Sequence, residues 1–243
     1  MKTHHTHHEG EPSGRTQETA QSGFRFLPVL TGLFVGILLL SNILASKMVR
    51  IGPFVFDGGT LLFPLSYLFG DLLTEVYGYK ATRKVIWTGF VMLLIMSVNI
   101  WFIGILPAEE TWTFQTDYSN ILMQMPRIVL ASIVAYFAGE YVNSVVLSRM
   151  KVLTRGRHLW ARTIGSTLAG QFLDTALFVV IAFGGLYPAE ILAIMALSNY
   201  LFKTGIEAIC TPVTYQAVRF MKNREKCDVF DHDEHYNPLP GAR

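Results

Sequence analysis

Long apolar runs constrain the fold of this chain more than any other feature of its sequence. A hydrocarbon core about 30 Å thick is crossed by a helix of roughly 20 apolar residues. Segments of this kind occur near residues 27–46, 59–78, 85–106, 127–148, 164–186 and 190–217. The sequence therefore predicts an all-α membrane protein, a bundle of six transmembrane helices joined by short connections.

The composition also favours a membrane location. Of the 243 residues, 51% are hydrophobic and 16% are charged, whereas soluble domains carry about 25% charged residues. The formal net charge of +2 is too small for the basic field of a nucleic-acid-binding protein. Cys210 and Cys227 are far apart and match no zinc or disulfide framework. We therefore expect a chain embedded in a lipid bilayer, with no nucleic-acid partner, no bound metal ion and no other cofactor.

The chain divides into two polar ends and one apolar domain. Residues 1–25 are polar and contain the stretch HHTHH. A flexible cytoplasmic tail is a better interpretation of them than a metal-binding tract, because nothing nearby could close a metal site. Residues 26–220 form the predicted transmembrane domain, and residues 221–243 a C-terminal cytoplasmic tail. The first apolar run does not resemble a cleaved signal peptide, since it is long enough to span and no small-residue cleavage site follows it.

The distribution of Lys and Arg predicts the orientation of the bundle. Basic residues concentrate in the predicted 79–84 and 149–162 loops and after the last span, whereas the 107–125 loop holds three acids and no Lys or Arg. Under the positive-inside rule, both termini are then cytoplasmic. Lys47 and Arg50 are the exception, because they fall on the outer side. They either have a local role there or are snorkelling side chains that cap the first helix.

Polar and ionisable side chains interrupt five of the six predicted spans. Two spans carry them at i, i+4 and i+8, on one helical face: Tyr67, Asp71 and Glu75, then Asn199, Lys203 and Glu207. Others in the spans are Asn42, Lys47, Glu140, Asn143, Ser144, Gln171 and Asp174. Because such residues are costly in a bilayer and usually face a cavity or a partner, they predict a polar chamber lined by most of the helices.

Structural interpretations of the same residues remain open. Lys203 could pair with Glu207 inside its own helix or reach the acids expected opposite, Asp71 and Asp174, and Asn or Gln could hold helices together. Glu75 lies near the cytoplasmic end of its span, where a carboxylate can reach water. If the residues do line a chamber, carboxylates and amides suit a planar polar ligand with several N–H donors, because a carboxylate accepts two parallel N–H bonds. The chemistry alone predicts a small polar solute.

Four stretches resemble the queuosine precursor transporter family, also described as vitamin-uptake-like transporters. They are SNILASK at 41–47, FPLSYLFGDLLTEVYGYKATRK at 63–84, GQFLDTALF at 170–178 and NYLFKTGIEAICTPVTY at 199–215. The resemblance covers nearly everything from about residue 28 to 230. It implies a multi-pass protein of the bacterial inner membrane that imports 7-cyano-7-deazaguanine, 7-aminomethyl-7-deazaguanine or queuine for tRNA modification. The chain is similar, more distantly, to the six-helix substrate-binding subunits of energy-coupling-factor vitamin transporters.

The resemblance also implies which residues bind the small-molecule deazaguanine base. Those in matching motifs are Asn42, Lys47, Asp71, Glu75, Gln171, Asp174, Asn199, Lys203 and Glu207; Tyr67, Arg127 and Asn143 complete the predicted substrate-binding set. A homodimer is kept as one candidate assembly.

Two other functions compete with a self-sufficient transporter. One is a substrate-binding subunit that needs a separate ATP-driven module. The other is an intramembrane enzyme with an aspartyl dyad. The sequence contains no HExxH, no GxSxG and no His in any predicted span, so we expect no catalytic residues and no enzymatic activity.

Overall fold

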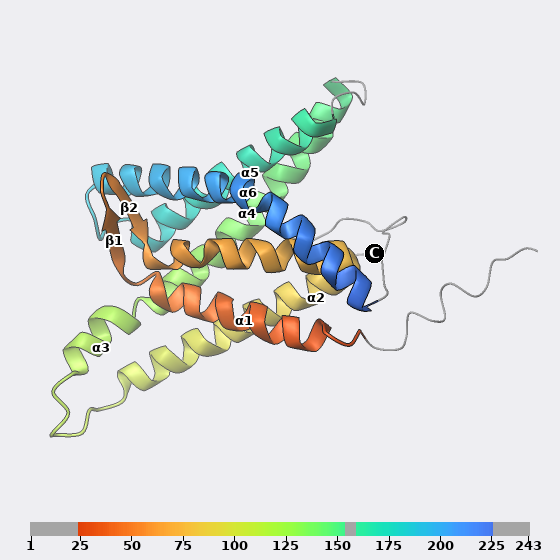
Figure 1. Ribbon diagram of the computed structural model, residues 1–243. Coiled ribbons are helices and arrows are strands. Elements are labelled where there is room, and N and C mark those ends of the chain that lie inside the picture. Colours follow the sequence, from red (N-terminus) through yellow and green to blue (C-terminus); the bar gives the residue numbers. More distant parts are fainter. Residues whose placement is uncertain (1–23, 154–158, 226–243) are drawn as a thin grey trace, which may run out of the picture.

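Helices make up most of the structure (Figure 1). The computed structural model describes residues 24–153 and 159–225. In chain order the elements are α1 (Leu27–Leu44), β1 (Met48–Ile51), β2 (Phe54–Asp57), the 3-10 helix η2 (Gly58–Leu62), α2 (Phe63–Ile105), α3 (Gln115–Leu122), α4 (Met125–Leu153), α5 (Leu159–Phe183) and α6 (Ala189–Glu225). The tails predicted at 1–25 and 221–243 fall mostly outside the described residues, and α6 continues through residue 225.

Several of these helices are suited to a bilayer by length and composition. Within the described residues, four segments are long and apolar enough to cross a membrane: Leu27–Leu44, Gly58–Ile105, Gln115–Val146 and Ile164–Phe183. Large apolar side chains on these helices point outward, as at Val98 and Val180, each 60% exposed. The expectation of a helical, multi-pass membrane protein is therefore confirmed. Six membrane crossings stay a prediction, because α6 is not among these four segments. Its apolar sequence is interrupted by Asn199, Lys203 and Glu207.

Gly78 breaks α2 into two limbs and corrects one predicted boundary. The sequence predicted a loop at 79–84, yet these residues are helical, and the break is confined to Gly78, with φ 78° and ψ 166°. Figure 1 shows the second limb of α2 turning back from the first at this point. A single glycine suffices because, without a Cβ, it adopts backbone angles that other residues avoid.

The predicted 149–162 loop is also shorter than expected. α4 runs to Leu153 and α5 begins at Leu159, so helix continues on both sides of residues 154–158, which lie outside the described residues. The end of an apolar run indicates where a helix leaves the hydrocarbon core, not where the helix itself ends. Lys and Arg are good helix formers, so the helix can continue into water.

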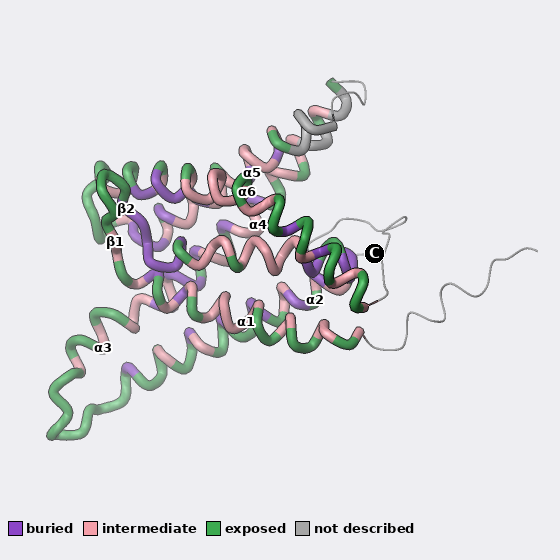
Figure 2. The backbone as a smooth tube through the Cα atoms, in the orientation of Figure 1, coloured by how far each residue is buried: buried purple, intermediate pink, exposed green. Residues whose placement is uncertain are grey.

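A β-hairpin between α1 and α2 was not predicted. β1 pairs antiparallel with β2 in the register Met48↔Asp57 to Ile51↔Phe54, and Gly52, at φ 58°, lies in the turn. A positive φ is what a two-residue hairpin turn requires. The last three residues of β2 are buried (Figure 2), and β2 packs against α6. The hairpin therefore places Asp57 and η2 inside the molecule.

The remaining packing brings α5 and α6 alongside α4 and α2. α4 lies along α5, and their backbones approach closely at Gly139 and Gly170: a Cβ on Gly170 would lie 2.8 Å from the Gly139 carbonyl oxygen. At the end of the bundle where α1 begins and α6 ends, the Glu225 carboxylate accepts hydrogen bonds from the Phe26 amide at 2.7 Å and the Tyr77 hydroxyl at 2.8 Å. This end is thus tied together by residues far apart in sequence.

Candidate functional site

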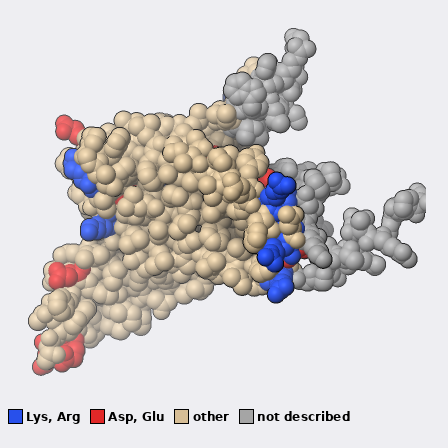
Figure 3. Space-filling model, in the orientation of Figure 1, with Lys and Arg blue, Asp and Glu red and all other residues tan. Residues whose placement is uncertain are grey.

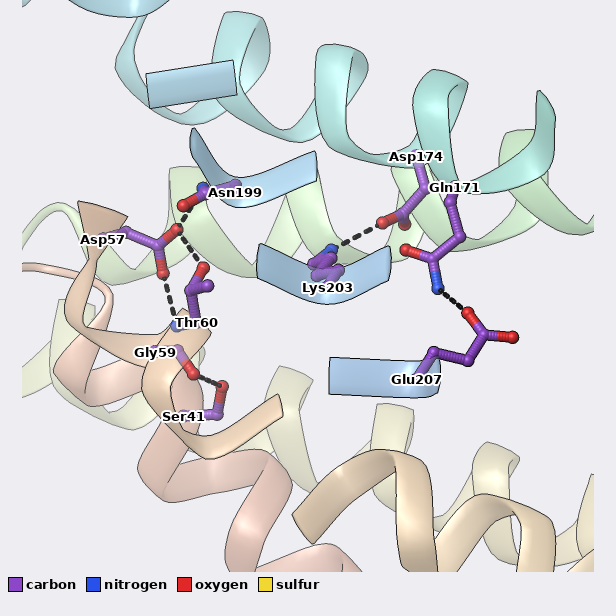
Figure 4. A network of polar contacts seen from close by, with 9 residues as sticks. All are labelled: Ser41, Asp57, Gly59, Thr60, Gln171, Asp174, Asn199, Lys203 and Glu207. Carbon is purple, nitrogen blue, oxygen red and sulfur yellow. Dashed lines mark hydrogen bonds and ion pairs between the residues drawn. The ribbon is translucent and has the colours of Figure 1, made fainter. Parts of the chain in front are cut away.

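Three polar contacts line the inner face of α6, one helical turn apart (Figure 4). Asn199, Lys203 and Glu207 each meet a side chain from another part of the chain. We call the set of Asp57, Asn199, Asp174, Lys203, Gln171 and Glu207 the polar ladder. Its α6 members span about 12 Å along the helix axis, at 1.5 Å per residue.

The middle contact of the polar ladder is an ion pair between α6 and α5. Lys203 Nζ lies 2.8 Å from Asp174 Oδ2, and the two side chains are 15% and 27% exposed. Lys203 Nζ also lies 5.3 Å from the ring centroid of Phe63, at the start of α2. Of the partners that the sequence left open for Lys203, the structure therefore shows Asp174, one of the acids expected opposite, and not Glu207. A lysine placed before its acid at i, i+4 is the less favourable order in a helix, and Asp174 is within reach across the interface.

Gln171 and Glu207 form the contact nearest the end of α6 that is rich in Lys and Arg. Gln171 Nε2 donates to Glu207 Oε2 at 3.3 Å, and Gln171 Oε1 is buried without a hydrogen-bond partner. The charges of Asp71 and Glu207 are close enough to interact, and the Tyr67 hydroxyl interacts with both carboxylates. The structure thus brings Tyr67 and Asp71 of α2 close to Glu207 of α6.

Asp57 forms the third contact and was missed from the sequence. Its carboxylate accepts hydrogen bonds from Asn199 Nδ2 at 2.7 Å, from the Thr60 amide at 3.0 Å and from Thr60 Oγ1 at 2.8 Å. Asp57 is 2% exposed and Asn199 1% exposed. The stretch DGGT carried a signal, since Asp is a preferred N-cap that binds the amide three residues on. The motif does not show that the carboxylate is buried, because Asp57 falls between the first two predicted spans, where an acid is ordinarily in water.

α4 contributes a further predicted residue to this region. The side chain of Asn143 lies against the backbone at Gly170, beside Gln171, and its Oδ1 is buried without a partner. Glu140, one turn earlier, interacts electrostatically with Asp174. Asn143 is therefore close to the polar ladder, although no hydrogen bond joins it to the ladder among the contacts described.

Two predicted residues make hydrogen bonds that join helices elsewhere. Asn42 is buried in α1, where its Nδ2 donates to the Leu38 carbonyl and its Oδ1 accepts from Ser132 of α4 at 2.9 Å. The Arg127 guanidinium donates to the carbonyl oxygens of Ile181 and Gly184 at the end of α5. In this structure Asn42 thus joins two helices, and Arg127 binds carbonyl groups left free at the end of a helix.

Two other predicted residues lie at the surface. Lys47 is exposed between α1 and β1. Glu75 is 64% exposed and lies 3.8 Å from Lys222 Nζ of α6. Glu75 is therefore more exposed than Asp71, its neighbour one turn earlier in α2, although the two charges are close enough to interact.

The chemistry of the polar ladder is that of recognition by hydrogen bonding. It offers carboxylate and amide oxygens as acceptors and Lys203 as a cationic donor, with the Phe63 ring beside it. No group of three His, Cys, Asp or Glu side chains in residues 24–153 and 159–225 could hold a metal ion.

Comparisons of the sequence with known proteins found one family model and several related transporters. A family model described as putative vitamin uptake transporter matches residues 57–217. The chain is 29% identical to a probable queuosine precursor transporter of Bacillus subtilis over 199 residues, 80% of this chain and 87% of that protein. It is 29% identical to a probable queuosine precursor transporter of Haemophilus influenzae (66% and 67% covered) and 28% identical to the queuosine precursor transporter of Escherichia coli (71% and 77% covered). No solved structure gives a significant match.

Proposed function

Because the chain belongs to the putative vitamin uptake transporter family, we propose that it is a membrane transporter that carries queuosine precursors into the cytoplasm. Its substrates would be 7-cyano-7-deazaguanine, 7-aminomethyl-7-deazaguanine or queuine. The observation that carries the proposal is the polar ladder itself, which holds a partly buried Lys203–Asp174 pair and acceptor atoms without partners. Such groups are costly in a membrane and usually serve a ligand path.

The ligand chemistry fits this arrangement. A deazaguanine base is planar and presents several N–H donors together with one carbonyl oxygen. Asp71 and Glu207 can accept paired N–H groups, and a lysine or amide N–H can meet the carbonyl. Phe63 and Tyr67, whose ring centroids are 6.2 Å apart, are aromatic faces on which such a ring can stack.

We further propose six crossings of the bacterial inner membrane, with each limb of α2 crossing once and both termini in the cytoplasm. Figure 3 supports this orientation, because Lys and Arg gather where α6 ends, acids lie over α3 and the segment before it, and a largely uncharged belt lies between. Lys and Arg also lie at the hairpin end, which matches the exception noted for Lys47 and Arg50. The acid Glu109 accepts hydrogen bonds from Thr111, which lower the pKa of its carboxyl and favour a charged form suited to an aqueous surface.

Uptake by cells tests the proposed function. A strain unable to make the precursor and lacking its own transporter should regain queuosine in its tRNA when it expresses this chain and receives one of the three bases. Competition among the bases then ranks them. A chain that reaches the membrane but restores nothing with any of the three would overturn the proposal.

Vesicles containing the purified protein alone test whether it transports without help. Uptake into such vesicles is expected, and the mass of the purified protein distinguishes a monomer from a homodimer. Tight binding of the base without uptake would instead assign the chain as a substrate-binding subunit of an ATP-driven transporter.

A further inference from the structure

The amide of Asn199 is held in one orientation by Asp57. Asn199 Nδ2 donates to Asp57 Oδ2 at 2.7 Å, while Asn199 Oδ1 is buried without a hydrogen-bond partner. A carboxylate only accepts hydrogen bonds, so the amide nitrogen must face Asp57. The amide oxygen must therefore face the other way.

Asp57 itself has little freedom to move. Two further donors, the amide and the hydroxyl of Thr60, bind its carboxylate. The backbone of η2 packs directly on α1, since a Cβ on Gly59 would lie 2.3 Å from the Ser41 carbonyl oxygen. A separate contact between β2 and α6 is the hydrogen bond that Ser198 Oγ accepts from the Val55 amide at 3.2 Å, which involves neither the Asp57 carboxylate nor the Asn199 amide. The orientation of the Asn199 amide is thus imposed by a rigid neighbour.

Gln171 shows the same arrangement two turns along the polar ladder. Its nitrogen donates to Glu207, and its oxygen is buried without a partner. In Figure 4 this oxygen lies on the side of the amide away from Glu207. Buried polar atoms in proteins nearly always have a partner, so two amide oxygens oriented by carboxylates point to a ligand that brings its own donors.

We propose that Asp57 is a positioning residue that presents Asn199 Oδ1 as an acceptor for an N–H group of the transported base. This inference rests on the proposed function and deepens it, because it assigns the orientation of one hydrogen bond between ligand and protein. The ligand class is a planar, purine-like base with N–H donors at its edge. A ligand that presents only acceptors at that position is rejected.

Exchanging the two side chains tests the proposal. In Asp57→Asn the new amide nitrogen faces Asn199, whose own amide must turn and present a nitrogen to the ligand. In the double variant Asp57→Asn, Asn199→Asp the amide and the carboxylate change places. The amide now at position 57 can donate to the carboxylate now at position 199, whose other oxygen is again an acceptor, and the total charge is unchanged. The control is Ser198→Ala, which removes the neighbouring contact between β2 and α6 but leaves Asn199 alone.

The measurement is the KM for uptake of labelled 7-cyano-7-deazaguanine, together with the amount of each variant in the membrane. We expect Asp57→Asn to raise KM about 10- to 100-fold with little change in maximal rate. The double variant and Ser198→Ala should have KM values near that of the wild type.

The other possible results distinguish a wrong proposed function from a wrong role of Asp57. A wild-type protein that takes up none of the three bases means that the proposed function is wrong. With an active wild type, an unchanged KM in Asp57→Asn, or a double variant as impaired as Asp57→Asn, overturns the positioning role. If Asp57→Asn does not reach the membrane, the KM of the double variant decides: a normal value supports the role and a raised value overturns it.

Discussion

Replacing Lys203 by Met is the sharpest perturbation of the polar ladder, because it leaves Asp174 without its cation. The carboxylate is 27% exposed and Lys203 15% exposed, so the pair lies between the buried and surface limits. Removing one partner of a buried pair costs about 3–5 kcal/mol. With this partial exposure we expect a value between that range and the 0–1 kcal/mol of surface pairs, about 2 kcal/mol, or about a 30-fold change in the folding equilibrium constant.

The double variant Lys203→Met, Asp174→Asn separates stability from transport. It removes both charges and should recover most of the lost stability, since a pair replaced by neutral groups is often tolerated. It should not recover uptake, because the lysine N–H that would meet the carbonyl oxygen of the ligand is gone. The assays are the apparent Tm of the purified protein in detergent and uptake in cells.

A matched control lies on the same helix. Lys222→Met breaks the pair with Glu75, in which the side chains are 27% and 64% exposed, and surface pairs contribute about 0–1 kcal/mol. If Lys203→Met lowers Tm no more than Lys222→Met does, or if the double variant is no more stable than Lys203→Met, the argument from burial is refuted.

Three further predictions concern the kink in α2, the carboxylate of Asp71 and the orientation of the bundle. Gly78→Ala should cost about 1–3 kcal/mol, since its φ and ψ suit only glycine; Gly70→Ala, with open space around the new Cβ, is the control, and equal Tm values would contradict the prediction. Asp71→Asn should abolish uptake at normal membrane levels, whereas Thr74→Ala, on an exposed face, should not; wild-type uptake by Asp71→Asn would remove that residue from the site. Cysteine labelling should find residues 109–117 periplasmic and residues 153–158 cytoplasmic, and the reverse result would invert the bundle.

The sequence predicted those features of this protein that depend on composition and local spacing. Apolar runs predicted a helical membrane protein because hydrocarbon accepts backbone only when its polar groups are paired within the helix. The spacing of Asn199, Lys203 and Glu207 placed them on one face because helical period is a local property. The motifs also predicted the family, which the family match over residues 57–217 confirms.

Partner choice could be predicted only in part in this way, since three acids, Asp71, Asp174 and Glu207, were candidate partners of Lys203. Lys203 meets Asp174 rather than Glu207, and Glu75 turns to Lys222 while Asp71 faces inward. Each contact joins elements whose relative rotation is set by packing, for example where Gly139 and Gly170 let α4 and α5 approach. Local spacing says which residues share a face, but not which helix lies opposite that face.

The formation of the hairpin and the burial of Asp57 depend on tertiary structure alone. The strands of β1 and β2 are four residues each, too short to be stable as an isolated hairpin, and they persist because β2 is buried against α6. That burial brings Asp57 to Asn199, 142 residues away in sequence. Composition and period determined that the chain enters a membrane as helices carrying polar faces, whereas long-range packing decided which polar atoms are paired and which, such as Asn199 Oδ1, are left for a ligand.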